Sequence, residues 1–112
     1  LKDLSKEPLI LVDEGNYSVT LENFKKYNLT ADVEYQVYDD YSILAMVKER
    51  LGISLMYSMV VKGFEEGLEI RPIKEHPQRP VAIGWLNYET MPIAARKFTD
   101  FIINKNKKEG LF

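Results

Sequence analysis

The chain has 112 residues, of which 46% are hydrophobic and 29% are charged, and its formal net charge is −2. These proportions are typical of one globular domain or of one lobe of a larger protein. The slight negative charge provides no positive surface for nucleic acid, so this chain alone is not expected to bind DNA. The absence of cysteine excludes disulfides, thiolate chemistry and cysteine-type zinc sites, and no apolar run is long enough to span a bilayer.

The N-terminal part predicts a buried strand. Residues 1–7 are expected to form a loop or a single helical turn. Pro8 cannot donate a backbone hydrogen bond and therefore suits the first residue of a strand. The continuous apolar run Leu9–Val12 is typical of a strand that is buried on both faces, and residues 13–16 form the loop at its carboxyl end.

A helix is expected next. Ser18 or Thr20 can act as its N-cap, and Leu21 and Phe24 are expected to be buried. The helix should end near Asn28, because asparagine tolerates the left-handed conformation that follows many helices.

The central part of the chain predicts a strand, a capped helix and a second strand. Val33–Tyr38 is the first strand, and Asp39 and Asp40 break it and offer a carboxylate cap. Ile53–Tyr57 is the second strand, and the two strands should lie parallel with a right-handed crossover. The helix between them has one apolar face, formed by Ile43, Leu44, Val47 and Leu51.

Ligands of open α/β sheets gather at the carboxyl ends of the strands. Six residues of this central part should therefore meet at one edge of the sheet: Tyr38, Asp39, Asp40, Tyr41, Met56 and Tyr57.

The remaining residues predict two more strands and a closing helix. Residues 58–62 can form one or two helical turns, Leu68–Ile73 and Val81–Leu86 read as strands, and residues 74–80 as a linker. The closing helix should have Thr90 as its N-cap and Pro92 in its first turn. Its apolar face comprises Ala94, Phe98, Phe101 and Ile102. The whole pattern indicates an α/β fold, an open and mostly parallel sheet with helices on both faces.

Five segments, in this order and spacing, resemble the second half of the effector-binding domain of LysR-type transcriptional regulators. They read PLILVDEG, VEYQVYDDYSILAMVKERLGISLMY, GLEIRPI, RPVAIGW and PIAARKFTDFI. The resemblance implies a Rossmann-like lobe of a periplasmic-binding-protein-like (type 2) effector domain, with a mixed, mostly parallel sheet. Residues 1–75 would form the second lobe, 76–80 the hinge, and 81–112 the strand and helix that return to the first lobe. We expect a helix-turn-helix domain and the start of the first lobe to precede Leu1 in a longer protein.

One residue departs from the family pattern. The family usually has a glycine two residues before the glycine that matches Gly52, where this chain has Arg50. The family glycine lets the chain leave the helix in a left-handed conformation, so Arg50 is expected to carry a cost or to change the helix end.

The candidate effector-binding residues include two acidic pairs, Asp13 with Glu14 and Asp39 with Asp40. Both pairs follow a strand and precede a helix, so both should face one cleft. Four carboxylates there would favour an effector that carries an amine or another cation, although acidic residues at helix starts also serve as caps. The other candidates, Tyr38, Tyr41, Met56 and Tyr57, either line an effector pocket or pack at a strand edge.

Catalytic signals are lacking in the sequence. His76, the single histidine, lies in the linker and reads as solvated, since no orienting partner or nucleophile accompanies it. No catalytic motif, phosphate loop or EF-hand spacing occurs, so neither a cofactor nor a metal is expected.

The resemblance implies a small-molecule effector-sensing module without catalysis, cytoplasmic and part of a homodimer or homotetramer. It would contact DNA only through a helix-turn-helix domain absent from this chain. Effector binding between the lobes would change their relative angle. One alternative is a lobe of an extracytoplasmic solute-binding protein, although the polar N-terminus lacks a signal-peptide pattern. The other is a small α/β enzyme that uses the edge carboxylates for acid–base chemistry.

Overall fold

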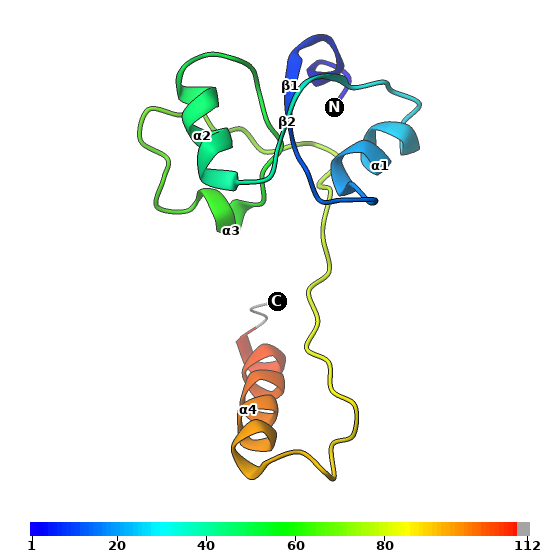
Figure 1. Cartoon of the computed structure of the whole chain (residues 1–112), viewed down its shortest axis with the longest axis vertical. Coiled ribbons are helices and arrows are strands. Elements are labelled where there is room, and N and C mark those ends of the chain that lie inside the picture. The colour runs from blue at the N-terminus through cyan, green and yellow to red at the C-terminus, as the bar shows by residue number, and fades with distance from the viewer. Residues whose placement is uncertain (110–112) are drawn as a thin grey trace. The chain divides into compact units, whose positions relative to one another are not determined.

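The computed structural model describes residues 1–109 and divides into two compact units, Leu1–Pro77 and a second that begins at Gln78 (Figure 1). The boundary falls within the predicted hinge, while the assignment of the units to two lobes stays a prediction. The first unit contains η1 (Leu4–Lys6), β1 (Pro8–Val12), α1 (Val19–Lys26), β2 (Asp32–Val37), α2 (Asp40–Lys48) and α3 (Ser58–Val61). The second contains α4 (Ile93–Glu109).

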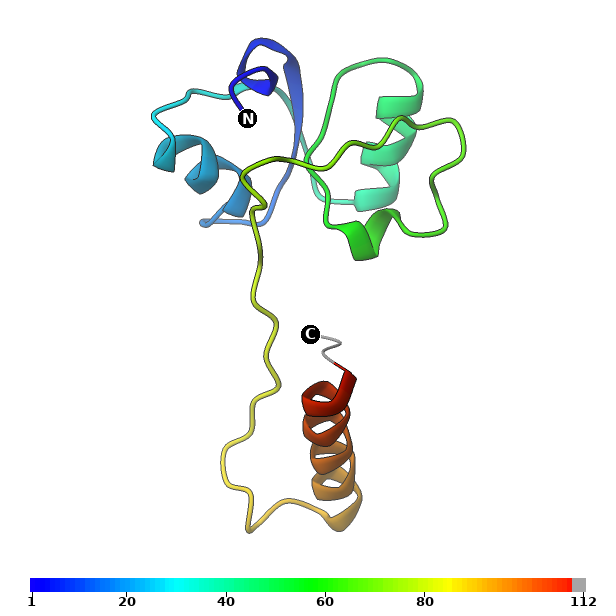
Figure 2. The ribbon, with the colours of Figure 1, turned by 180° about the vertical axis from the view of Figure 1, so that it is seen from behind.

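β1 is the central strand of the first unit. It pairs in parallel with β2 on one side, and Leu9 forms a parallel bridge with Ile53 on the other. Ile10 N–H donates to the Ile53 carbonyl at 2.8 Å, and Ile53 N–H donates to the Pro8 carbonyl at 2.9 Å. Leu9, Ile10 and Leu11 are buried. The prediction of a first strand that is buried on both faces is therefore confirmed. α1 lies on one side of the strand pair, and α2 and α3 lie on the other (Figures 1 and 2).

Local capping explains where α1 begins and ends. The Ser18 hydroxyl accepts a hydrogen bond from Leu21 N–H at 3.2 Å, as predicted for the N-cap. Asn28 has a φ of 55°, and the next N–H, of Leu29, donates back to the Phe24 carbonyl at 2.9 Å. This is a Schellman ending with asparagine in the left-handed position. Phe24 is buried as predicted, but Leu21 lies on the exposed side of the helix, so its predicted burial is wrong.

α2 ends in the same way but with an arginine in the left-handed position. Arg50 has a φ of 60°, its N–H donates to the Val47 carbonyl at 3.0 Å, and Leu51 N–H donates to the Met46 carbonyl at 3.1 Å. The helix end typical of a C-terminal glycine is thus kept with Arg50, which has to bear the steric cost of its Cβ. Leu51 follows the end of the helix and is exposed, which corrects its predicted place on the buried face.

Gly52 lies against β1. A Cβ at this residue would approach the Pro8 carbonyl oxygen to 2.5 Å and the Ile10 Cγ1 atom to 3.2 Å. The first of these is a backbone atom that cannot turn away. Only glycine therefore lets this segment come close enough for Ile53 to bond with β1.

Three predicted strands are corrected. The strand expected over 53–57 is reduced to the single bridge at Ile53, and residues 68–73 and 81–86 do not form strands. Their apolar composition gives strand propensity, but a strand also needs a neighbouring backbone with which to pair. Of the loop or single helical turn expected within 1–7, the structure forms the turn, η1, and the short helix expected after Tyr57 is confirmed by α3.

The second unit consists of an extended segment and α4. The Pro92 carbonyl accepts the Arg96 N–H at 3.0 Å, so the helix starts at Ile93. Thr90 is not its cap, since its hydroxyl donates to the Asn87 carbonyl at 3.3 Å in the preceding loop. The apolar face predicted for the closing helix is not buried, and both Phe98 and Phe101 are exposed.

One tertiary contact ties the loop of the second unit to α4. The Tyr88 hydroxyl donates to the Asp100 carboxylate, with both oxygens at 2.8 Å, and this hydrogen bond raises the pKa of Tyr88. The Arg96 guanidinium lies 5.9 Å from the Tyr88 ring centroid, and the Trp85 ring lies 6.2 Å from it. Among residues 1–109, no helix combines the length and the apolar composition that crossing a membrane requires.

The left-handed conformation of Arg50 predicts that Arg50→Gly stabilises the chain. A non-glycine residue in the left-handed region costs about 1–2 kcal/mol in the folded chain. Glycine removes this cost but loses more conformational entropy on folding, which offsets part of the gain. We expect a gain of about 1 kcal/mol in the free energy of unfolding in urea. Ala45→Gly, inside the same helix, is the control and should destabilise by about 1 kcal/mol. An equal loss of unfolding free energy in both variants would contradict a steric cost of the left-handed backbone conformation at Arg50.

The close approach at Gly52 predicts that Gly52→Ala destabilises the chain by about 1–3 kcal/mol, because the added methyl group forces β1 and residue 53 apart. Gly84→Ala is the matched control, since a Cβ there meets no atom within 4 Å. Urea unfolding measures both variants, and an unchanged midpoint for Gly52→Ala would show that this approach is not required.

Candidate functional site

Three segments of the first unit end at one edge, the carboxyl edge of the strands. Val12 is opposite Val37 in the parallel register, and Asp13 N–H donates to the Val37 carbonyl at 2.9 Å. The third segment runs in the same direction from Ile53, and the Ser54 hydroxyl holds it against β1 by donating to the Ile10 carbonyl at 2.7 Å. The structure therefore brings the residues that follow the three segments, 13–14, 38–41 and 56–57, to a common edge.

Asp13 and Glu14 shape the loop between β1 and α1. Asp13 Oδ1 accepts the Gly15 N–H at 3.0 Å, and Glu14 Oε2 accepts the Val19 N–H at 3.3 Å. Both carboxylates thus serve the backbone of the loop and the first turn of the helix. They also line a cavity of about 150 Å³, together with Leu11, Val12, Gly15, Asn16, Ser18, Leu21, Glu22 and Gln36.

Asp39 is the N-cap of α2, so one of the two carboxylates predicted to offer a cap does so. Its Oδ2 atom accepts the Ser42 hydroxyl at 2.7 Å and the Ser42 backbone N–H at 2.9 Å. These hydrogen bonds lower the pKa of Asp39, the hydroxyl being the larger cause. Asp40 is half-buried in the first turn, where a carboxylate also suits the helix dipole.

Tyr38 and Tyr41 lie on the outside of the edge. The exposed fraction is 82% for Tyr38 and 61% for Tyr41. Tyr41 packs edge-to-face against Phe64, with 5.1 Å between the ring centroids. Neither tyrosine lines the cavity beside Asp13 or either of the two cavities described below. Each tyrosine therefore offers an exposed aromatic surface at the carboxyl edge and does not form a cavity wall.

Met56 and Tyr57 are half-buried at the start of α3. Both line a small cavity of about 50 Å³, with Val19, Thr20, Asn23, Leu55, Ile73 and Pro77. The Ser54 hydroxyl lies 3.6 Å from the Met56 sulfur. Met56 is the one predicted site residue that also lines the largest of the three cavities described in this section.

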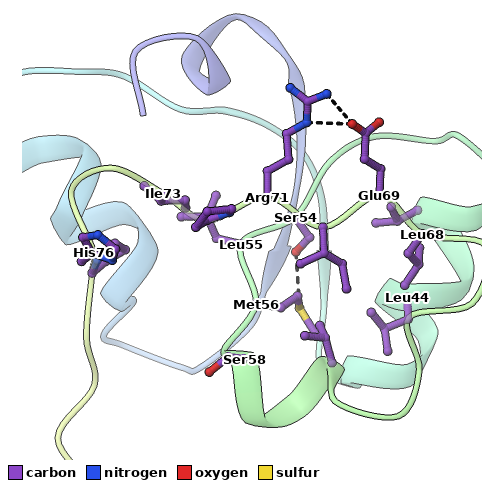
Figure 3. A pocket seen from close by; sticks show the side chains of 15 residues that line it. Leu44, Ser54, Leu55, Met56, Ser58, Leu68, Glu69, Arg71, Ile73 and His76 are labelled. Carbon is purple, nitrogen blue, oxygen red and sulfur yellow. Dashed lines mark hydrogen bonds and ion pairs between the residues drawn. The ribbon is translucent and has the colours of Figure 1, made fainter.

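The largest cavity has a volume of about 450 Å³ (Figure 3). Its walls come from α2, the segment after Ile53, α3 and the irregular stretch that was predicted to be a strand. The lining residues are Leu44, Val47, Ser54, Leu55, Met56, Ser58, Val61, Leu68, Glu69, Ile70, Arg71, Pro72, Ile73, His76 and Pro77. At the rim, Arg71 donates to Glu69, with 2.7 Å between Arg71 Nε and Glu69 Oε1.

His76 was not predicted as part of a site. Its backbone φ is 46°, its N–H donates to the Ile73 carbonyl at 3.0 Å, and its side chain lines the large cavity. The only signal in the sequence is its position directly before Pro77 in a proline-containing linker, which fits a bend. Within the described part of the chain, no three His, Asp or Glu side chains are grouped as a metal would require.

Residues 1–107 match the family described as LysR substrate binding domain. The chain belongs to this family. It is also similar to the protein named "Uncharacterized HTH-type transcriptional regulator YvbU" of Bacillus subtilis (strain 168), with 26% identity over 102 residues. That alignment covers 89% of this chain and 35% of the relative, so the chain spans about a third of the relative's length. No solved structure matches the chain significantly.

The family match confirms the resemblance inferred from the five sequence segments. It identifies the chain with the effector-sensing domain of LysR-type regulators and does not favour the solute-binding protein. A periplasmic-binding-protein-like α/β fold follows from the family, and the parallel pairing of β1 and β2 agrees with it.

The hydrogen bonds of Asp39 predict an acid dependence of stability. Because its pKa is lowered in the folded chain, its contribution is complete above the ordinary carboxyl value near pH 4 and is lost as pH falls through the lowered value. Asp39→Asn keeps a cap but cannot titrate, so its free energy of unfolding should fall less below about pH 4 than that of the unaltered chain. The same acid slope in both proteins would contradict the assignment.

Proposed function

We propose that the carboxyl edge of the first unit is the effector-binding site of a LysR-type transcriptional regulator. A small-molecule effector would contact this edge through Asp13, Glu14, Tyr38, Asp39, Asp40, Tyr41, Met56 and Tyr57. The proposal has no catalytic step and requires neither cofactor nor metal.

The convergence of three chain segments at one edge carries this proposal. Asp13 N–H bonds to the Val37 carbonyl, and Ser54 bonds to the Ile10 carbonyl. These bonds support a shared edge for the residues that follow the three segments. In open α/β sheets this is where ligands bind, because loops and helix N-termini meet there. The family match supports an effector as the ligand.

In the whole protein the edge would face the first lobe across a cleft, with residues 76–80 as the hinge and the returning segment 81–112 completing that lobe and its mixed sheet. Effector binding would favour one relative angle of the lobes. That shift would bias a cytoplasmic homodimer or homotetramer whose helix-turn-helix domains contact DNA. The name of the Bacillus subtilis relative, an HTH-type transcriptional regulator, supports the presence of a helix-turn-helix domain in the whole protein.

We further propose that the effector carries an amine or another cation. Three of the four edge carboxylates, those of Asp13, Glu14 and Asp39, accept backbone hydrogen bonds at 2.9–3.3 Å. A carboxylate has about four acceptor sites, so these bonds leave Asp13 and Asp39 able to accept from a ligand as well, although both Ser42 bonds to Asp39 are made to one oxygen, Oδ2. Asp40 has no such bond within residues 1–109 and is the carboxylate with most capacity for a ligand.

The test is an amide chemical-shift titration of the 112-residue chain with four probes, namely succinate, benzoate, 1,4-diaminobutane and benzylamine. We expect the amines to give saturable shifts at residues 13–14, 38–41 and 56–57. Asp40→Asn should weaken amine binding by about tenfold, as expected for the loss of one charged hydrogen bond. Asp32→Asn is the matched control, since Asp32 lies at the opposite end of β2 and should leave binding unchanged.

The outcomes separate the two parts of the proposal. Tight binding of succinate at the edge would overturn the preference for a cation and keep the effector site. Shifts that avoid the edge with all four probes would overturn the site itself.

A further inference from the structure

The large cavity of the first unit has the size of a ligand site. Its volume of about 450 Å³ lies within the range of about 300–1,000 Å³ that is usual for small-molecule pockets. All fifteen lining residues belong to the first unit, so the cavity needs no other part of the chain. It extends from the carboxyl edge at Met56 into the space beneath residues 68–73 (Figure 3).

The cavity exists because residues 68–73, which form one of its walls, make no strand pairing with the segment after Ile53 on the opposite wall. Residues 68–73 form no strand, and the backbone bonds that hold this stretch are turns at its two ends, Leu68 N–H to Glu65 at 3.0 Å and His76 N–H to Ile73 at 3.0 Å. Leu68 and Ile73 are nevertheless half-buried, on the side of the cavity. Apolar walls that meet no other protein atoms across a cavity gain dispersion contacts from an apolar ligand.

The charges of the wall cancel each other. Arg71 and Glu69 are the charged residues of the lining, they are hydrogen-bonded to one another, and both are largely exposed at the rim. Most of the other walls are aliphatic or proline side chains. An ionic ligand would lose its hydration in this space without meeting a free counter-charge.

Two polar groups of the lining remain available for a ligand. The Ser58 hydroxyl and the His76 ring have no hydrogen-bond partner within residues 1–109, whereas the Ser54 hydroxyl is bound to the Ile10 carbonyl. His76 is held at the rim by a backbone in the left-handed region, which for residues other than glycine is uncommon and clusters at ligand sites.

We propose that this cavity is a second ligand site, for an uncharged, mainly apolar small molecule with one hydrogen-bonding group. The apolar body fills the space between α2, α3 and residues 68–73, and the polar group meets Ser58 or His76. This site is distinct from the acidic edge in its ligand chemistry, and it adjoins the edge through Met56.

Three probes that share one ring test the proposal, namely benzyl alcohol, benzoate and benzylammonium. In an amide chemical-shift titration of the 112-residue chain, benzyl alcohol should shift the resonances of Leu44, Val47, Leu68 and Ile73 and saturate. The two ions should bind there at least about tenfold more weakly, since their charge stays unpaired. Resonances of residues 13–14 and 38–41 report separately on the effector site, so failure at one site is distinguishable from failure at the other.

Two residues of α3, Met59 and Val61, give a matched pair of variants. Val61 lines the cavity and Met59 is 75% exposed and does not. Val61→Phe should fill the cavity and lower the affinity for benzyl alcohol by about tenfold, whereas Met59→Phe should change it by less than about twofold. Ile70→Trp, at a lining residue that is 49% exposed, gives a second filled cavity if Val61→Phe does not fold.

Absence of saturable shifts at the cavity residues with benzyl alcohol would overturn the proposal, because the walls would then close on one another in solution. Equal affinity for the alcohol and either ion would overturn the ligand class. Unchanged binding in the filled variants would place the ligand elsewhere.

Discussion

The first unit depends on the backbone pairing of β1 at both of its edges. β1 bonds to β2 on one side and to Ile53 on the other, with Leu9, Ile10 and Leu11 buried between the helices. Because both pairings are parallel, all three segments leave the sheet in the same direction. The candidate site residues therefore gather at one edge as a consequence of burying a single five-residue strand, and Gly52 permits this by allowing the third segment to approach.

The sequence predicted best those features whose causes lie within a few residues. Ser18 and Asp39 cap helices by bonding N–H groups three residues ahead, and Asn28 ends a helix through its own backbone conformation. For Arg50 the family pattern left two outcomes open, a steric cost or a different helix end, and the structure keeps the helix end with Arg50 in the left-handed position. Such interactions depend on residue types a few positions apart, so they can be predicted without knowing which distant segments pack together.

The predictions that failed concern partners far along the chain. The stretches 68–73 and 81–86 have strand-like composition, yet neither meets a free backbone edge within its own unit. Burial of Leu21 and Leu51 was wrong for a related reason, because periodicity shows which face is apolar but not whether another element covers it. The cavity near His76 could not be predicted at all, since its walls come from separate parts of the chain that only the fold brings together.

The edge carboxylates show why acidic residues after strands are ambiguous in a sequence. Asp13 accepts an N–H of its own loop and Asp39 accepts an N–H of the first turn of α2, so both carboxylates already stabilise backbone groups. The pKa of Asp39 is lowered because the hydroxyl and N–H donors of Ser42 favour the charged form of its carboxylate. A cation at this edge would share the carboxylates with those donors. The charge of the site and the stability of its helices are therefore coupled, and a ligand that draws Asp39 away from Ser42 would loosen the start of α2 as it binds.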